Sequence, residues 1–247
     1  MYLTIQAIVL RVTDYNDRDA LLTVLSRNHG KLTIKARGLR RKNSPLIAPC
    51  QLLAYGEFTL FEYRGMYTIN EAQSIELFSP LRRDLIKLSL GTYFAQAAEV
   101  ISQEDLPNPE LQSLLLNCLF ALSRLNESEQ KVKAVFEMRA ACLAGYMPDL
   151  FGCHECGSQT PDKFDLAEGR LECTRCRSMD SKGIRMPINP AVLEAMRYTC
   201  LCDPKKLFSF QIGEENLTVL SQLTEAYLTT QLERGFSTLD FYKSLLI

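Results

Sequence analysis

The segment LTIQAIVLRVTDYNDRDALLTVLSRNHGKLTIKA, residues 3–36, decides how the first part of this chain folds. It holds three short runs rich in β-branched and aliphatic residues, at positions 3–12, 20–26 and 30–36, with the partial alternation of β-strands. Residues 14–19 form a polar bend, and the sequence RNHG at 27–30 is typical of a tight hairpin turn. The segment therefore predicts three consecutive strands.

Two further strands are predicted at QLLAYGEFTLFEY (51–63) and MYTINEAQSIEL (66–77), with Arg64 and Gly65 closing a hairpin between them. A longer basic loop, RGLRRKNSP (37–45), separates them from the first three. Five strands in residues 1–80 match the size of a small closed barrel such as the OB-fold. An SH3-like barrel or an open meander has the same periodicity, so the pattern leaves that choice open.

Beyond residue 80 the apolar period becomes helical. Helices are predicted at residues 80–102, 109–125, 128–145, 189–198 and 214–233, with a short last helix from Ser237. Pro80 is expected in the first turn of the first helix, whose apolar stripe is Leu81, Leu85, Leu88, Thr92 and Ala95. The expected fold class is α+β multidomain, with a small N-terminal barrel such as the OB-fold (1–80) and an all-α C-terminal domain (81–247).

Four cysteines interrupt the helical part in two C-x-x-C pairs, Cys153 with Cys156 and Cys173 with Cys176. Sixteen residues separate the pairs, which is within the spacing of structural zinc sites. Four thiolates close the tetrahedron of one structural Zn²⁺ and leave no position for substrate. The sequence predicts an inserted zinc-binding loop at about residues 150–185, against the alternative of buried thiols or disulfides.

The run Cys153-His154-Glu155 also resembles the zinc deaminases, in which a Glu works beside a zinc-bound water. Against this, Cys156 can fill the fourth metal position. The acidic residues between the inner cysteines exceed the basic ones by two, which disfavours contact with phosphate. A structural role for the metal is the better interpretation.

Other catalytic chemistry has little support, so we do not expect an enzyme. The chain has two histidines, neither in a nucleophile motif, and Gly30-Lys31 lacks the upstream glycine of a phosphate-binding loop. No apolar run reaches the ~20 residues that span a bilayer, and no signal peptide is recognisable. With nine cysteines that cannot all pair with one another, we expect a cytoplasmic protein with no membrane partner.

Basic residues concentrate in residues 20–55, which contain no Asp or Glu although the net charge of the chain is −1. The simplest interpretation of such a run is a solvated face of the protein. Its place on a small barrel with aromatic residues nearby favours instead binding to the phosphate backbone of a nucleic acid. The aromatic residues available are Tyr15, Phe58, Phe61, Tyr63 and Tyr67, most of which we expect in the core. The candidate DNA-binding residues are Lys35, Arg37, Arg40, Arg41, Lys42, Arg27 and Lys31.

Three segments taken together resemble the RecO family of bacterial recombination mediators and DNA repair proteins. They are QAIVLRVTDYNDRDALLTVLSRNHGKLTIKARGLRRKNS (6–44), FEMRAACLAGYMPDLFGCHECG (136–157) and GRLECTRC (169–176). The resemblance implies an N-terminal OB-fold and a helical domain carrying the zinc loop. It places DNA contacts at Arg37, Arg40, Arg41 and Lys42, with Lys35 on the adjoining strand.

The resemblance also implies a non-enzymatic function without a small-molecule substrate. A RecO-like protein binds single- and double-stranded DNA, anneals complementary strands and, with RecR, helps RecA displace single-stranded DNA-binding protein, whose C-terminal tail contacts the helical domain. Its expected location is the cytoplasm, associated with the nucleoid. The alternative is a zinc-containing RNA- or DNA-binding regulatory or scaffold protein without annealing activity.

Overall fold

The structure is a computed structural model that describes residues 1–125, 127–176 and 183–246. The chain divides into two compact units, Met1–Leu125 with Phe236–Ile247, and Asn126–Gly235. The predicted boundary at residue 80 stays a prediction, although the change from strands to helices does fall between Glu76 and Leu85. Of the predicted zinc insertion at 150–185, residues 177–182 lie outside the described part, as do 126 and 247 of the predicted helical domain.

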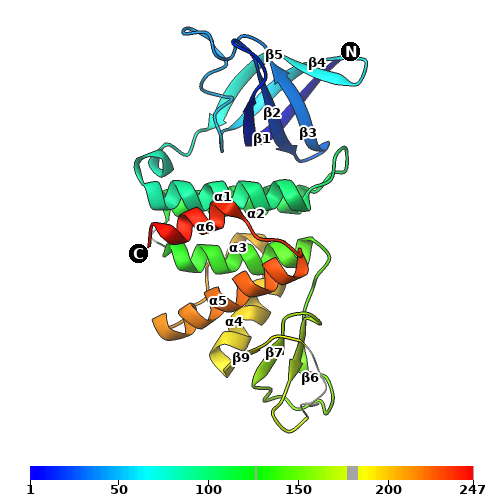
Figure 1. The fold of residues 1–247 in the computed structure, drawn as a ribbon, viewed down its shortest axis with the longest axis vertical. Coiled ribbons are helices and arrows are strands. Elements are labelled where there is room, and N and C mark those ends of the chain that lie inside the picture. Colours follow the sequence, from blue (N-terminus) through cyan, green and yellow to red (C-terminus); the bar gives the residue numbers. More distant parts are fainter. Residues whose placement is uncertain (126, 177–182, 247) are drawn as a thin grey trace. The chain divides into compact units, whose positions relative to one another are not determined.

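The first unit contains a closed five-stranded barrel (Figure 1). Its strands are β1 (Tyr2–Asp14), β2 (Ala20–Ser26), β3 (Gly30–Ala36), β4 (Tyr55–Tyr63) and β5 (Met66–Glu76). Their order is β1-β2-β3-β5-β4, and the long β1 pairs antiparallel with both β2 and β4. A short parallel pairing of β3 with β5 closes the barrel, which confirms an OB-like fold and excludes the open meander.

The barrel interior is filled by alternate side chains of every strand, among them Ile5, Leu22, Ile34 and Phe58. The prediction that most of the nearby aromatic residues are core is wrong, because Tyr15, Phe61 and Tyr63 are exposed. On β4 the odd positions Phe61 and Tyr63 face out while Phe58 and Leu60 face in. The strand period alone does not say which face is the inner one.

Helices of the first unit are α1 (Leu85–Ile101), α2 (Pro109–Arg124) and α6 (Ser237–Ser244), preceded by the 3₁₀ helix η1 (Ser79–Arg83). The predicted start and stripe of α1 need correction. Pro80 lies in η1, and α1 begins at its N-cap Asp84, whose side chain accepts a hydrogen bond from the Lys87 amide. Leu85, a member of the predicted stripe, is exposed. Helix α1 packs against β1, α2 and α6, so the faces it buries differ from that single stripe.

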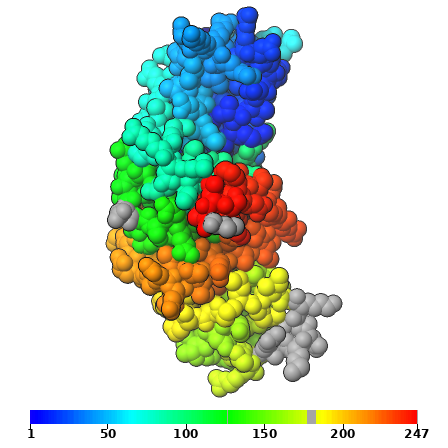
Figure 2. Space-filling model, turned by 60° about the vertical axis from the view of Figure 1, so that its left-hand side comes forward, coloured from blue at the N-terminus to red at the C-terminus, as the bar shows by residue number. Residues whose placement is uncertain are grey.

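The C-terminal helix α6 lies against α1 although most of the chain separates them in sequence (Figures 1 and 2). Tyr93 of α1 meets Phe236, just before α6, edge to face at 5.4 Å between ring centroids. The Thr238 hydroxyl donates to the side-chain oxygen of Gln96 at 2.5 Å. The end of the chain is therefore part of the unit that carries the barrel.

The second unit contains α3 (Glu129–Leu143), α4 (Pro190–Leu201), the 3₁₀ helix η2 (Pro204–Lys206) and α5 (Glu214–Gln231). Helix α3 packs against α4 and α5, and it buries a charged pair, Lys133 with Glu137 at 2.9 Å. Lys133 also meets Glu225 at 2.8 Å, and burial raises the pKa of the Glu137 carboxyl. None of the helices in the described ranges is long and apolar enough to span a membrane.

The segment between α3 and α4 is a small four-stranded sheet in the order β6-β8-β7-β9. Its strands are β6 (Asp149–Cys153), β7 (Lys163–Asp165), β8 (Arg170–Glu172) and β9 (Arg185–Pro187). The sequence predicted only a loop here, because runs of three to five residues are too short to show a strand period.

Candidate nucleic-acid interface and metal centre

The basic loop follows β3 and is held to the bend between β1 and β2. Its Gly38 amide donates to the Asp19 carboxylate at 2.9 Å, and its Arg40 amide donates to the Arg18 carbonyl at 3.1 Å. The Gly38 amide, with smaller contributions from Asn16 and Lys35, lowers the pKa of Asp19 below its usual value. An ionised Asp19 thus fixes the start of the loop relative to the barrel.

The cations of this region differ in whether a carboxylate already neutralises them. Lys35 pairs with Asp19 at 3.3 Å and lies over the Tyr15 ring, 4.4 Å from its centroid. Arg40 pairs with Asp14 at 2.9 Å.

By contrast, Arg37, Arg41 and Lys42 are exposed and form no ion pair within the part of the chain that the structure describes. Their charge is therefore available to an anionic partner.

Two of the predicted DNA-binding residues lie elsewhere on the barrel. In the β2–β3 pair, Ala20 lies opposite Ala36 at one end and Ser26 opposite Gly30 at the other. Seven-residue strands extend ~20 Å, so Arg27 and Lys31 are about that far from the basic loop. The structure thus separates the seven predicted residues into a group of five and a group of two.

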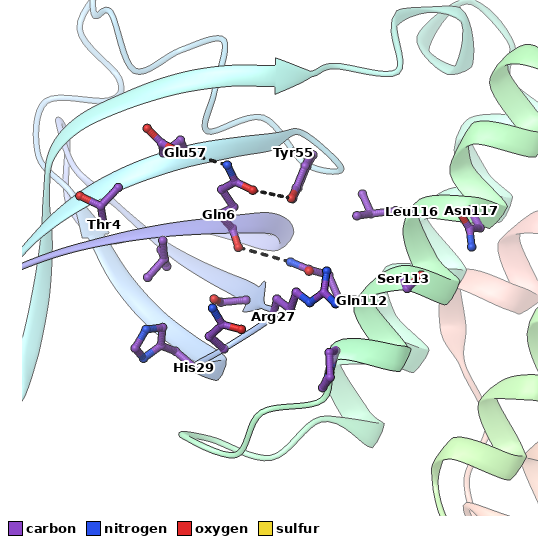
Figure 3. A pocket seen from close by; sticks show the side chains of 14 residues that line it. Thr4, Gln6, Arg27, His29, Tyr55, Glu57, Gln112, Ser113, Leu116 and Asn117 are labelled. Carbon is purple, nitrogen blue, oxygen red and sulfur yellow. Dashed lines mark hydrogen bonds between the residues drawn. The ribbon is translucent and has the colours of Figure 1, made fainter. Parts of the chain in front are cut away.

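The second group, Arg27 and Lys31, lies where the barrel packs against helices α1 and α2 of the first unit. The Lys31 ammonium donates to the Glu99 carbonyl of α1 at 3.2 Å. Arg27 lines a polar pocket of about 440 Å³ between the barrel and α2 (Figure 3). On one wall of it, the Gln112 amide donates to the Leu25 carbonyl at 2.9 Å and to the Gln6 carbonyl at 3.4 Å.

Sequence reasoning missed two exposed cations beside the predicted loop. Arg18 lies in the β1–β2 bend, where its carbonyl receives the amide of Arg40. Arg64 lies in the β4–β5 turn with φ at 51°, its guanidinium 5.2 Å from the Tyr63 ring centroid. Each is the only basic residue of its turn, so no local run of basic residues marks it.

The four cysteines of the predicted zinc site lie together, with all sulfur atoms within 4.8 Å of one another. Cys156 Sγ and Cys173 Sγ are 3.8 Å apart, close to the ~3.8 Å edge of a tetrahedron with ~2.3 Å zinc–sulfur bonds. Four thiols at this separation can hold a metal ion, and they fit a closed tetrahedral site.

Each C-x-x-C pair is formed by a tight turn at the end of a strand. The Gly157 amide donates to the Cys153 carbonyl at 2.8 Å, and the Cys176 amide donates to the Cys173 carbonyl at 3.0 Å. Gly157 has φ at +69°, a region that favours glycine. These turns bring the second thiol of each pair back to the first.

The pKa values of the thiols also suit a cation. Burial raises the pKa of Cys153, but amides of Cys156, Glu155 and Cys173 directed at its sulfur outweigh burial and lower it to about 7. By contrast, hydrogen bonding with the neighbouring thiols of Cys156 and Cys173 raises the pKa of Cys176 to about 12. One thiolate therefore forms readily, and the close sulfurs disfavour a further negative charge unless a cation lies between them.

Part of the negative charge of the cysteine segment is neutralised by buried ion pairs. Arg185 of β9 meets Asp165 at 3.1 Å and Glu172 at 2.6 Å, and all three side chains are buried. Counting residues along the segment therefore overstates the negative charge on its surface. These ion pairs join β7, β8 and β9 beside the cysteines.

Comparison with known proteins gives matches over nearly the whole chain. The family model described as Recombination protein O N terminal matches residues 1–78, and the one described as Recombination protein O C terminal matches residues 82–240. DNA repair protein RecO of Acetivibrio thermocellus is 32% identical over 246 residues, 99% of this chain and 97% of that protein. The protein of the same name from Bacillus subtilis is 29% identical over 225 residues, 90% of this chain and 86% of that protein.

Proposed function

This chain belongs to the RecO family, and on that premise we propose that it is a DNA repair protein that acts by binding DNA rather than by catalysis. The observation that carries the proposal is a group of exposed cations, Arg37, Arg41 and Lys42, on a loop fixed to the barrel, none of which forms an ion pair with another described residue. Exposed cations on a fixed support attract a polyanion and contact its phosphates without reading its bases.

The proposed activity is annealing of complementary single strands. A strand held on the basic loop has part of its phosphate charge neutralised, which lowers the repulsion felt by its complement. Base pairing then selects the sequence. Because this step needs no nucleotide hydrolysis, it accords with a chain in which no phosphate-binding loop is recognisable.

Lys35 and Arg40 complete the principal interface, each shared with a carboxylate of the β1–β2 region. Arg27 and Lys31 form a second contact ~20 Å away, a distance that about six nucleotides of a B-form strand cover. Strands shorter than this would touch one group only. We therefore expect affinity to rise with strand length up to that point.

The proposed partners are single- and double-stranded DNA, RecR and the C-terminal tail of single-stranded DNA-binding protein, and through them RecA. The proposed location is the cytoplasm, on the nucleoid. The proposed metal is one Zn²⁺ held by the four cysteines, where it would fix the small sheet of the second unit. Because four thiolates leave the ion no open position, its role is structural.

The test is annealing of complementary oligonucleotides coated with single-stranded DNA-binding protein, with and without this protein, at two salt concentrations. We expect acceleration that falls with salt, and we expect Arg40→Glu with Arg41→Glu to remove it for all sequences alike. Unchanged annealing by a folded double variant would place the interface elsewhere. DNA binding without acceleration of annealing would favour the regulatory or scaffold alternative.

A further inference from the structure

The barrel carries a hollow of about 550 Å³ on its outer surface, at the end where the β4–β5 hairpin turns. This volume is within the ~300–1,000 Å³ typical of ligand sites. We call it the aromatic hollow. It is lined by Tyr2, Arg37, Phe61, Tyr63, Arg64, Met66, Thr68, Ile69 and Asn70.

The aromatic side chains of the hollow are unusually exposed. Tyr2 and Tyr63 are 62% and 60% exposed, Phe61 42% and Met66 60%. Large apolar side chains gathered on a surface mark an interaction site more often than scattered ones do. The next outward positions along β1 and β4 are polar, with Thr4 opposite Thr59 and Gln6 opposite Glu57. Tyr2, Phe61 and Tyr63 therefore form one cluster at this end of the strands.

Strand pairing fixes the aromatic residues as one platform. Tyr2 lies opposite Phe61 in the β1–β4 register, and their ring centroids are 5.4 Å apart. Met1 and Glu62 exchange backbone hydrogen bonds beside them, which secures the start of β1. Tyr63 continues the platform at the β4–β5 turn. A platform held by a sheet keeps its shape before a ligand arrives.

The charge of the hollow points to an anionic ligand. Two arginines, Arg37 and Arg64, line it, and its nine lining residues include no Asp or Glu. Arg37 is also the first residue of the basic loop, so the hollow and the loop form a continuous surface. A ligand that suits this surface carries flat apolar rings joined by negative charges.

We propose that the aromatic hollow is a base-stacking subsite for single-stranded DNA, in which unpaired bases stack on Tyr2, Phe61 and Tyr63 while Arg37 contacts the phosphate between them. This inference rests on the proposed DNA binding and adds a selection for unpaired strands. Bases in a duplex are stacked on one another and cannot enter the hollow. Annealing therefore removes the stacking contact, and the duplex product is held only by its phosphates.

The first experiment measures affinity for single-stranded and duplex DNA of equal length. Stacking contributes about five- to a hundredfold in affinity per base on alanine substitution. Tyr2→Ala with Phe61→Ala should lower single-strand affinity by at least about fivefold and leave duplex affinity unchanged. Phe151→Ala, which truncates a 79%-exposed ring in the second unit, is the matched control and should change neither.

The outcomes separate the inference from the function on which it rests. Failure of the unaltered protein to bind any DNA refutes the proposed function. If the unaltered protein binds DNA but the double variant loses single-strand and duplex affinity equally, or loses neither, the stacking subsite is refuted and the proposed function stands. If the double variant keeps its DNA affinities but no longer binds a proline-rich peptide that the unaltered protein binds, the hollow is a site for a protein partner and the stacking subsite is refuted.

A second variant tests the inference without truncating the platform. The chain has no tryptophan, so Tyr63→Trp introduces a single tryptophan into the hollow, whose fluorescence can be excited apart from that of the tyrosines. An oligothymidylate should quench its emission, whereas an abasic strand with the same phosphates and the matched duplex should not. Phe151→Trp is the control fluorophore, for which no quenching is expected. Equal quenching by the abasic strand would overturn the assignment.

Discussion

The basic loop has three cations without an ion pair in the part of the chain that the structure describes, and they give a quantitative prediction for the salt dependence of DNA binding. Each phosphate contact on a single strand contributes about −0.7 to the slope of log K against log salt concentration. Contacts from Arg37, Arg41 and Lys42 together contribute about −2 to the slope, which accounts for about a 20-fold loss of affinity between 50 and 200 mM salt. Arg40 contributes less, because it must exchange its pairing with Asp14 for a phosphate.

Replacing Arg41 and Lys42 by Gln leaves Arg37 as the loop cation without an ion pair among the described residues. The slope should become shallower by about 1.4, so the same change in salt should weaken binding about sevenfold less than in the unaltered protein. The assay is fluorescence anisotropy with a labelled oligothymidylate at four or more salt concentrations. Replacing the exposed neighbours Lys205 and Lys206 of the second unit by Gln changes the net charge equally and is the control.

Two results would refute this reasoning. If the Arg41 and Lys42 variant keeps the slope of the unaltered protein, the basic loop does not contact phosphate. If the Lys205 and Lys206 control lowers the slope as much, binding follows the charge of the whole protein and not the placement of the loop.

Three further predictions follow from individual side chains. Asp14→Asn should free the guanidinium paired with it, raise DNA affinity at low salt and steepen the salt slope by up to about 0.7; a shallower slope would contradict this. Cys153→Ser with Cys156→Ser should abolish zinc in metal analysis and leave the salt slope unchanged, whereas lost DNA binding by a folded variant would give the metal a larger role. Gly30→Ala should lower the melting temperature more than Gly65→Ala, for which the left-handed backbone alone costs about 1–2 kcal/mol, or about 2–8 °C. Both glycines have positive φ, but a Cβ at Gly30 would lie 2.2 Å from the Leu106 carbonyl oxygen and one at Gly65 would meet nothing within 4 Å; equal melting temperatures would contradict this.

The local elements follow closely from the sequence because their signals are local. Two predicted helix starts, Ser128 and Asn189, are N-caps in the structure, and each accepts a hydrogen bond from the backbone amide three residues on. The five barrel strands were marked by turn residues between short apolar runs. The four cysteines could be assigned as ligands because metal coordination restricts spacing within each pair.

Features that depend on neighbours distant in sequence could not be predicted in this way. The aromatic residues of β4 divide between core and surface only once the barrel closes. The exposed Leu85 shows that the buried faces of α1 depend on which elements pack around it. The number of acidic residues in the cysteine segment overstated its surface charge, because Arg185 forms ion pairs with both Asp165 and Glu172.

The sequence by itself determined the strands of the barrel and most of the helices, the four cysteines that could hold a metal ion, and the concentration of positive charge in residues 20–55. The tertiary structure decided which of those charges are free: it paired Lys35 and Arg40 with carboxylates, moved Arg27 and Lys31 to the far end of the hairpin, and left Arg37 beside exposed aromatic rings. The physical reason is that backbone periodicity and turn chemistry act between residues close in sequence. Charge pairing and exposure depend instead on distances through space, which the sequence fixes only through the completed fold.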